Sequence, residues 1–356
     1  MWGLLFKVAR AGALVVVPCA MSLAATASGP QPGKLETYKD WTIGCDNGGH
    51  CSAVSLIPEE ADDNLPGSQI LMIVERDAGP SGEIVITAQL GEAKAKPGNI
   101  DFMVDGTRLL SAPARNDEIT VRGPQASALA LAMARGNRLE VRQGARLLGS
   151  PSLKGSAAAF RYMDARQGRA GTSTALVATG ALGAQAVKAA PLLPLIKRLP
   201  IPRSAAPALW RDEQLRAVKF AGCQDEQRDD LDVEIYALGA ERALLLIPCG
   251  SGAYNFSSVP LLAIGKPGRR TFAFAAFDYT PGWGGESDTP MLVNAGFDPK
   301  TGRLSSYAKG RGLGDCGSAE EYVWDGARFR LVQASAMGEC RGAWTWITSW
   351  RARTTP

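Results

Sequence analysis

The stretch AKGRGLGDCGS, residues 308–318, places Gly310, Gly312 and Gly314 at alternate positions ahead of Cys316. A glycine-rich loop can bind phosphate when its backbone N–H groups point at the anion from the start of a helix. Here the spacing is GxGxG, and the residues that follow, GSAEEYVWDG, read as a loop and a strand. We therefore interpret the stretch as a tight loop between two strands, anchored by a disulfide at Cys316, and predict no nucleotide or other cofactor.

The sequence contains one histidine, His50, which lies beside Cys51 in a short predicted hairpin. A Ser-His-Asp or Cys-His centre would have to use this histidine, and the second kind also needs a reduced thiol. A zinc site could combine His50 with Cys45 and Cys51, but the usual paired CxxC spacing is absent. We predict no metal site, and the sequence identifies no catalytic residue.

Ligand-binding residues are expected in glycine-rich loops of the C-terminal half, because such loops are held by a rigid scaffold of strands. The candidates combine aromatic rings, which can stack on sugars, with an amide and two carboxylates. They are Tyr254, Asn255, Trp283, Glu286 and Asp288. The alternative is that Tyr254 and Trp283 fill the open ends of a sheet.

Two further patterns have a structural interpretation. Asp230, Asp232 and Glu234 alternate with apolar residues, which predicts the solvated face of a strand, although carboxylates held close together could also bind Ca²⁺. Three tryptophans between residues 344 and 350 share one parity. This spacing favours side chains in a core over a platform for sugars.

The first 27 residues have the features of a secretory signal peptide. Lys7 and Arg10 precede an apolar run that ends in small residues, which predicts cleavage after Ala27 and a periplasmic location. A lipid anchor on Cys19 is the alternative. Because Pro18 stands where lipoprotein signals carry a small residue, lipidation is not expected.

Six cysteines follow the predicted signal peptide, and an even number in an exported chain indicates disulfides. They fall into three local couples separated by long stretches without cysteine. The nearest-neighbour pairs are Cys45 with Cys51, Cys223 with Cys249, and Cys316 with Cys340.

The composition limits the fold class and the partners. The formal net charge of +4 in 356 residues gives no general attraction for nucleic acid, and no basic run with interleaved aromatics occurs. We therefore expect no nucleic-acid partner. With 40 glycines and 22 prolines, short strands and turns are favoured over long helices.

The chain divides into four predicted segments. A signal peptide, 1–27, precedes an N-terminal α+β domain, 28–177, an Ala/Pro-rich linker, 178–209, and a C-terminal domain, 210–356, of nearly all antiparallel strands. The predicted fold class is α+β, predominantly antiparallel β. Residues 175–196 are apolar enough to suggest a membrane span, but Pro191 and Pro194 interrupt them, so we expect an extended linker and no stable span.

Several motifs in order, IPCGSGAYNF, KGRGLGDCGS, YVWDGARFRL and ECRGAWTWITSWRA, resemble an exported proteobacterial family known as domain of unknown function 1176. The resemblance extends over the mature chain and includes DWTIGCDNGGHCSA and the proline-rich middle. The N-terminal region is also similar to the invasion-associated locus B proteins, through an early W-x-x-x-C element and SLKGSAAAFRYM. These resemblances imply a periplasmic protein and supply no catalytic residue.

Two functions remain open from the sequence. The first is a non-enzymatic envelope protein that binds a partner, a glycan or a peptidoglycan fragment through loops of the second domain. The alternative is a carboxylate-dependent periplasmic hydrolase that acts on an envelope glycan or peptide with residues such as Glu286 and Asp288.

Overall fold

The computed structural model describes residues 29–59, 70–91, 93, 95–115, 117–202, 206, 208–223, 232–280 and 289–355. The predicted signal peptide and three candidate residues, Trp283, Glu286 and Asp288, lie outside the described residues. The described part is mostly antiparallel β-structure with a few short helices, which confirms the predicted predominance of antiparallel strands.

An antiparallel sheet of six strands, the N-terminal sheet, has the order β1-β2-β3-β4-β5-β8. A four-stranded sheet, β10-β9-β6-β7, lies beside it. The strands of the first sheet are β1 (Leu35–Tyr38), β2 (Trp41–Cys45), β3 (Cys51–Ser55), β4 (Leu71–Arg76), β5 (Ile84–Gln89) and β8 (Glu118–Arg122). Those of the second are β6 (Asn99–Val104), β7 (Thr107–Pro113), β9 (Leu139–Gln143) and β10 (Arg146–Gly149).

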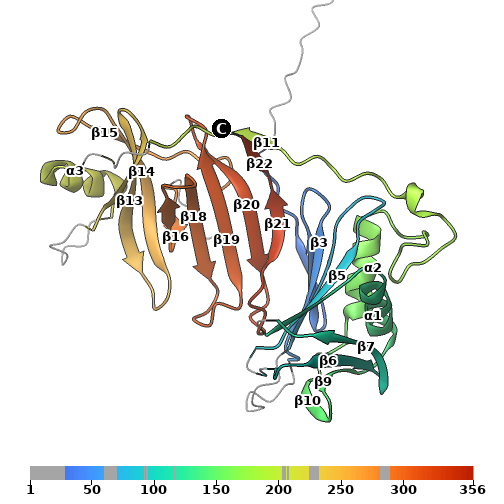
Figure 1. Ribbon diagram of the computed structural model, residues 1–356. Coiled ribbons are helices and arrows are strands. Elements are labelled where there is room, and N and C mark those ends of the chain that lie inside the picture. The colour runs from blue at the N-terminus through green and yellow to red at the C-terminus, as the bar shows by residue number, and fades with distance from the viewer. Residues whose placement is uncertain are drawn as a thin grey trace, which may run out of the picture.

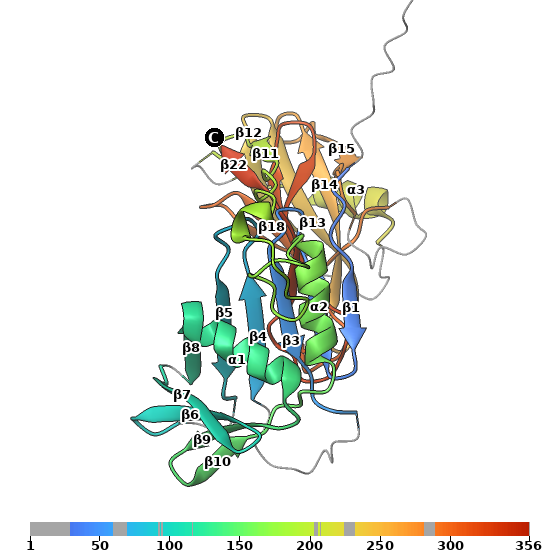
Figure 2. The ribbon, with the colours of Figure 1, turned by 90° about the vertical axis from the view of Figure 1, so that its right-hand side faces the viewer.

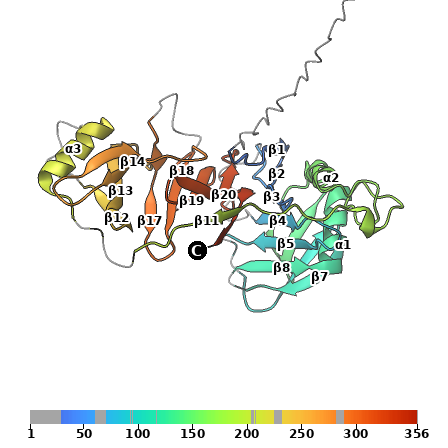
Figure 3. The same ribbon diagram turned by 90° about the horizontal axis from the view of Figure 1, so that it is seen from above.

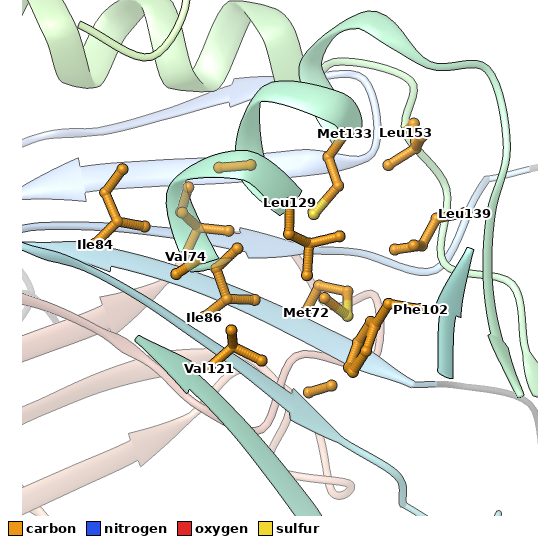
Figure 4. Packing of buried hydrophobic residues seen from close by; sticks show 14 of the residues in the cluster. Met72, Val74, Ile84, Ile86, Phe102, Val121, Leu129, Met133, Leu139 and Leu153 are labelled. Atoms are coloured by element: carbon orange, nitrogen blue, oxygen red, sulfur yellow. The ribbon is translucent and has the colours of Figure 1, made fainter. Parts of the chain in front are cut away.

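Two helices, α1 (Gly123–Arg135) and α2 (Ser156–Arg166), cover one face of the N-terminal sheet (Figure 2). A proline in the first turn of α1 suits the start of a helix, because its missing N–H would have no partner there. Leu129 and Met133, one turn apart, point from α1 toward Met72 and Phe102 of the two sheets (Figure 4). This helical spacing of apolar residues joins both sheets to one hydrophobic core.

The turn between β6 and β7 shows how a local signal fixes strand register. Asp105 and Gly106 have φ angles of 49° and 83°, the left-handed pair that a two-residue hairpin requires. Val104 therefore pairs with Thr107, as an Asp-Gly hairpin turn requires.

Two further sheets occupy the C-terminal half. The outer sheet has the order β12-β13-β14-β15, with β16 also paired to β14, and the central sheet has the order β17-β18-β19-β20-β21. The outer strands are β12 (Glu234–Gly239), β13 (Arg242–Ser251), β14 (Phe256–Ile264), β15 (Thr271–Phe274) and β16 (Leu292–Val293). The central strands are β17 (Gly296–Asp298), β18 (Arg303–Lys309), β19 (Gly317–Trp324), β20 (Phe329–Met337) and β21 (Ile347–Arg351).

The elements stack in layers, with α1 and α2 at one end of the molecule and α3 (Arg211–Ala221) at the other (Figures 1 and 3). Apolar clusters join the N-terminal sheet to α1 and α2, and the outer sheet to α3. Another cluster fills the space between the outer and central sheets. A smaller cluster, including Val54, Ile73 and Ile347, joins the N-terminal sheet to the central sheet. Since β2 and β3 are covered on both faces, their residues are buried without alternation.

The predicted linker lies along these layers as an extended segment. After a short 3-10 helix, η1 (Ala184–Ala186), the strand β11 (Leu195–Lys197) pairs in parallel with β22 (Arg353–Thr355) near the C-terminus. The longest of the described helices, α1, has 13 residues, too few to span a bilayer. The domain boundaries at residues 177 and 210 stay a prediction.

The helix α3 corrects the expectation of nearly continuous strands after residue 210. Its sequence, RDEQLRAVKFA, carries a buried glutamate, Glu213, at the third helical position, and the carboxylate accepts a hydrogen bond from the Trp210 backbone N–H at 3.1 Å. The carboxylate satisfies a donor that the first helical turn would otherwise leave unpaired. Ala217, Val218 and Ala221 then form the face that packs on the outer sheet.

Three disulfides pair the cysteines as the nearest-neighbour interpretation predicts. Cys45–Cys51 closes the β2–β3 hairpin, and Cys223–Cys249 ties the end of α3 to β13. Cys316–Cys340 holds the glycine-rich loop between β18 and β19, where Gly310 lies so close that a Cβ there would be 2.7 Å from the Cys316 sulfur. The loop is therefore a disulfide-anchored turn between strands, as predicted.

Removing the Cys223–Cys249 bridge by a double alanine substitution is expected to lower the free energy of unfolding by about 3 kcal/mol, because the bridge closes a long loop in the unfolded chain. Removing the Cys45–Cys51 bridge, which closes a shorter loop, is expected to lower the free energy of unfolding by about 2 kcal/mol. Urea unfolding of both variants measures the two losses. A larger loss for the Cys45–Cys51 variant would contradict the loop-length explanation.

Candidate ligand-binding cleft

The predicted loop residues that the structure describes have structural roles. Asn255 binds the end of β18 twice, donating to the Lys309 carbonyl at 2.9 Å and accepting from the Lys309 N–H at 3.1 Å. The hydroxyl of Tyr254 donates to the Gly310 carbonyl at 3.3 Å, and its ring lies over Gly312. Both residues fasten the β13–β14 hairpin to the glycine-rich loop, and their role in ligand binding stays a prediction.

A cleft of about 710 Å³ lies elsewhere, between β12, the turn after β17 and a segment that we call the strap, residues 195–202. Most of its lining is apolar, and two cationic side chains stand among the lining residues. The lining residues are Arg198, Pro200, Ile201, Pro202, Ala206, Ile235, Tyr236, Ala237, Pro299 and Lys300. This volume lies within the range of roughly 300–1,000 Å³ that is usual for small-ligand sites.

The β12 side of the cleft is the edge of a strand. Ile235, Tyr236 and Ala237 are consecutive and alternate between the two faces of the outer sheet, yet all three line the cleft. A cavity above or below the sheet would contact only every second residue of β12, whereas a cavity beside the edge of the strand contacts consecutive residues. The cleft therefore runs along the side of β12 that points away from β13.

The strap forms the opposite wall and is fixed from behind. The backbone N–H groups of Arg198 and Leu199 donate to Thr355 and Trp324, each at 2.9 Å. Ile196 packs with Val323 and Val332 on the central sheet. These contacts fix the first part of the strap, residues 196–199, to β22 and to the central sheet.

The polar groups at the cleft are two cations and a tyrosine. Arg198 donates a hydrogen bond to the Thr301 carbonyl at 3.3 Å, and Lys300 lies two residues away from Asp298 in the same turn. The Tyr236 hydroxyl donates to Glu234, and its ring lies 5.1 Å from that of Phe297. Burial, reinforced by the Glu234 carboxylate, raises the pKa of Tyr236 to about 12, so this phenol stays neutral and can donate or accept hydrogen bonds.

A second polar feature is buried between the outer and central sheets. Glu320 on β19 is 3% exposed, and its Oε2 has no hydrogen-bond partner among the residues that the structure describes. The hydroxyl of Tyr322, two residues along the same face, is likewise without a partner there. Burial raises the pKa of Glu320 to about 7, because a carboxylate loses its hydration in this environment.

The surroundings of Glu320 leave its charge uncompensated. Its cross-strand neighbours are Ser306 on β18 and Ala334 on β20, both small. The carboxylate of Asp278, which lies near Tyr322, is bound by Arg330 at 2.6 Å and by the Leu331 backbone N–H at 2.8 Å. No salt bridge to Glu320 is found within the described ranges. This carboxyl group is therefore an acid whose protonation depends on pH near neutrality.

The histidine lies at a third place, on the hairpin closed by Cys45–Cys51. Its Nδ1 is 2.8 Å from Asp77 Oδ1, and its Nε2 is 3.5 Å from Glu75 Oε1. The Glu75 contact, against a smaller opposing effect of burial, raises the pKa of His50. In the part of the chain that the structure describes, no group of three or more His, Cys, Asp and Glu side chains is arranged to hold a metal ion.

Sequence reasoning missed the cleft and Glu320. The cleft joins segments that are far apart in the sequence, so no local pattern marks it. Glu320 carried a usable signal, because strand alternation gives it the same parity as the apolar rings of Tyr322 and Trp324. Glu321, of opposite parity, faces outward and pairs with Arg303.

The comparisons with known proteins identify relatives whose activity is not described. The family model "Protein of unknown function (DUF1176)" matches residues 35–353. "Uncharacterized protein YpfG" of Escherichia coli (strain K12) is 29% identical over 346 residues, which cover 89% of this chain and 92% of that protein. The crystal structure of invasion associated protein b from Bartonella henselae aligns with 15% identity and a TM-score of 0.30, covering 38% of this chain and 99% of that one.

Proposed function

The chain belongs to the family of proteins of unknown function DUF1176, and we propose that it works in the periplasm as a binding protein without catalytic activity. In this proposal, the cleft between the strap and β12 holds an apolar chain that carries a negative charge. The observation that carries the proposal is the cleft itself, with a lining that is apolar apart from Arg198, Lys300 and the hydroxyl of Tyr236.

The chemistry of the lining supports this ligand class. Burial of apolar ligand surface against Ile201, Ile235 and the prolines stabilises a complex by roughly 25 cal/mol for each Å² removed from water. The two cations supply a favourable potential for an anionic group and fix the orientation of the ligand.

The disulfides support a location outside the cytoplasm. Three bridges link all six cysteines that follow the predicted signal peptide. Such bridges form and persist in oxidising compartments and are rare in the cytosol. This property agrees with the export predicted from Lys7, Arg10 and the apolar run after them.

The described carboxylates favour binding over the hydrolase alternative. Glycoside hydrolysis commonly needs two carboxyl groups on either side of the bond. Glu320 is buried, and Asp278 is already bound by Arg330 and by a backbone N–H. Glu286 and Asp288, on which the alternative rested, lie outside the described residues.

The proposal is tested with 8-anilinonaphthalene-1-sulfonate, a fluorescent probe that combines apolar rings with one negative charge. We expect saturable binding of one probe per chain in the cleft. Replacing both cations, Arg198→Glu with Lys300→Glu, is expected to weaken this binding at least tenfold, because attraction becomes repulsion.

The matched control is Lys266→Glu, a reversal at an exposed lysine in the turn between β14 and β15 that is not part of the cleft lining. Its affinity for the probe should equal that of the unmodified protein. Equal affinities of all three proteins would contradict the proposed site, as would the absence of saturable binding.

A further inference from the structure

We propose that the occupant of the cleft is an extended, acidic polypeptide segment, which pairs with the open edge of β12 as an added strand of the outer sheet. This inference rests on the proposed function, because it names the class of ligand that the same cleft takes. It follows from the backbone of β12, from the prolines of the strap and from the two cations.

β12 is the terminal strand of its sheet. Its register pairs Glu234 with Leu246 and Gly239 with Arg242, and β13 is its sole partner among the described strands. No backbone hydrogen bond joins β12 to a described residue on its other side. An edge strand of this kind presents a row of N–H and C=O groups that another strand can bind.

The cleft gives access to this edge. Because Ile235, Tyr236 and Ala237 all line it, a chain lying in the cleft would run beside their backbone. Successive side chains of an added strand would point alternately to the two faces of the outer sheet. The cleft therefore offers hydrogen bonds from the backbone and apolar contacts for the side chains of one segment.

The strap leaves this edge unpaired because of its composition. Pro200 and Pro202 face β12 across the cleft, and proline has no N–H to donate. The strand β11, just before them, is paired instead with β22. The strap thus comes close to the edge without closing the sheet, which leaves room for a separate chain.

The charges indicate what kind of segment would fit. Arg198 extends from the strap, and Lys300 from the turn after β17. Arg198 keeps a contact to the Thr301 carbonyl, so it is held near Lys300. An aspartate, a glutamate or a C-terminal carboxylate of the segment would find both cations at this end of the cleft.

A polypeptide satisfies the cleft better than a hydrocarbon chain. An acyl chain would cover the edge of β12 without forming hydrogen bonds, and each buried backbone group left unpaired weakens the complex. An extended peptide covers the same surface and pairs these groups. The geometry therefore favours the peptide among apolar anions.

The test measures displacement of the fluorescent probe by an unmodified peptide, two methylated peptides and a fatty acid. The unmodified ligand is an octapeptide of alternating valine and threonine that ends in two aspartates. Two further peptides have the same sequence and carry methyl groups on alternate backbone nitrogens, one on the odd-numbered and one on the even-numbered residues. The fatty acid is dodecanoate. We expect the unmodified peptide to displace the probe, and at least one methylated peptide to bind tenfold or more weakly, because methylation removes N–H donors on one edge. Dodecanoate should compete less well than the unmodified peptide.

The outcomes separate this inference from the proposed function. If dodecanoate displaces the probe and the peptide does not, strand addition is wrong and the binding cleft stands. If both methylated peptides match the unmodified one, pairing with β12 is also wrong. If the probe itself does not bind in the cleft, the proposed function fails before any peptide is added.

Discussion

Replacing Glu320 with glutamine is expected to stabilise the protein by about 3 kcal/mol at pH 8 and to leave its stability nearly unchanged at pH 4.5. Glutamine has almost the shape of a protonated glutamic acid but cannot ionise. The variant therefore removes only the cost of a buried negative charge. That cost is large here because Glu320 is 3% exposed and its Oε2 lacks a partner among the described residues.

The direction of the pH effect follows from the raised pKa. In the folded protein the pKa of Glu320 is about 7, above the ordinary value of 4.5. Below pH 4.5 the group is protonated in both the folded and unfolded states, so its stabilising contribution is fully present. Between pH 4.5 and 7 the unfolded chain releases the proton first, and this contribution is lost as the pH rises.

The adjacent residue provides the control. Glu321 lies on the opposite face of β19 and forms a half-exposed ion pair with Arg303. Replacing Glu321 with glutamine should change the free energy of unfolding by less than about 1 kcal/mol at either pH. Urea unfolding of the three proteins at the two pH values gives the comparison. A Glu320→Gln variant whose advantage does not grow between pH 4.5 and pH 8 would refute the buried, ionisable carboxyl.

The second large effect is expected at the buried pair that anchors α3. Arg270→Met should lower the free energy of unfolding by about 3 kcal/mol, because it leaves a buried carboxylate without its cation. Arg270 Nη1 lies 3.3 Å from Glu213 Oε2, and the two side chains are 3% and 0% exposed. Although burial raises the pKa of Glu213, hydrogen bonds from Trp210 and Arg270 prevail and lower it, so the group remains ionised.

Arg270 also fastens the chain just before α3. Arg270 donates a second hydrogen bond, 3.2 Å long, to the carbonyl of Ala208, two residues after the cleft residue Ala206. The control is Arg138→Met, just before β9, since the side chain of Arg138 is exposed and its ion pair with Glu140 contributes less than about 1 kcal/mol. Thermal or urea unfolding measures both. Equal losses for the two variants would contradict the role of the buried pair.

Local chemistry made the disulfides and several turns predictable. Cys45 and Cys51 flank a short turn, and pairing β2 with β3 places them directly opposite each other. The Asp105–Gly106 pair required positive φ angles and therefore a hairpin. Such features depend on residues close in the sequence, so composition and spacing were sufficient.

Features that depend on distant segments were not predictable. The cleft needs the strap, β12 and the turn at Pro299, which are brought together only by the packing of the sheets. The shared parity of the three tryptophans predicts a core position for Trp344, but its side chain is 52% exposed. Parity fails here because β21 begins only at Ile347, so Trp344 lies before the strand. Trp346 stacks on Tyr307 outside the strand, and Trp350 packs partly into the core as predicted.

Hydrogen exchange of the β12 amides, with and without the acidic valine–threonine peptide, tests strand addition most directly. In the free protein, the N–H groups of β12 that point away from β13 have no described partner and should exchange quickly. If the peptide adds a strand, these amides between Glu234 and Gly239 should become protected at least tenfold, while the amides that already pair with β13 change little. Peptide binding that leaves the outward amides unprotected would contradict pairing along β12.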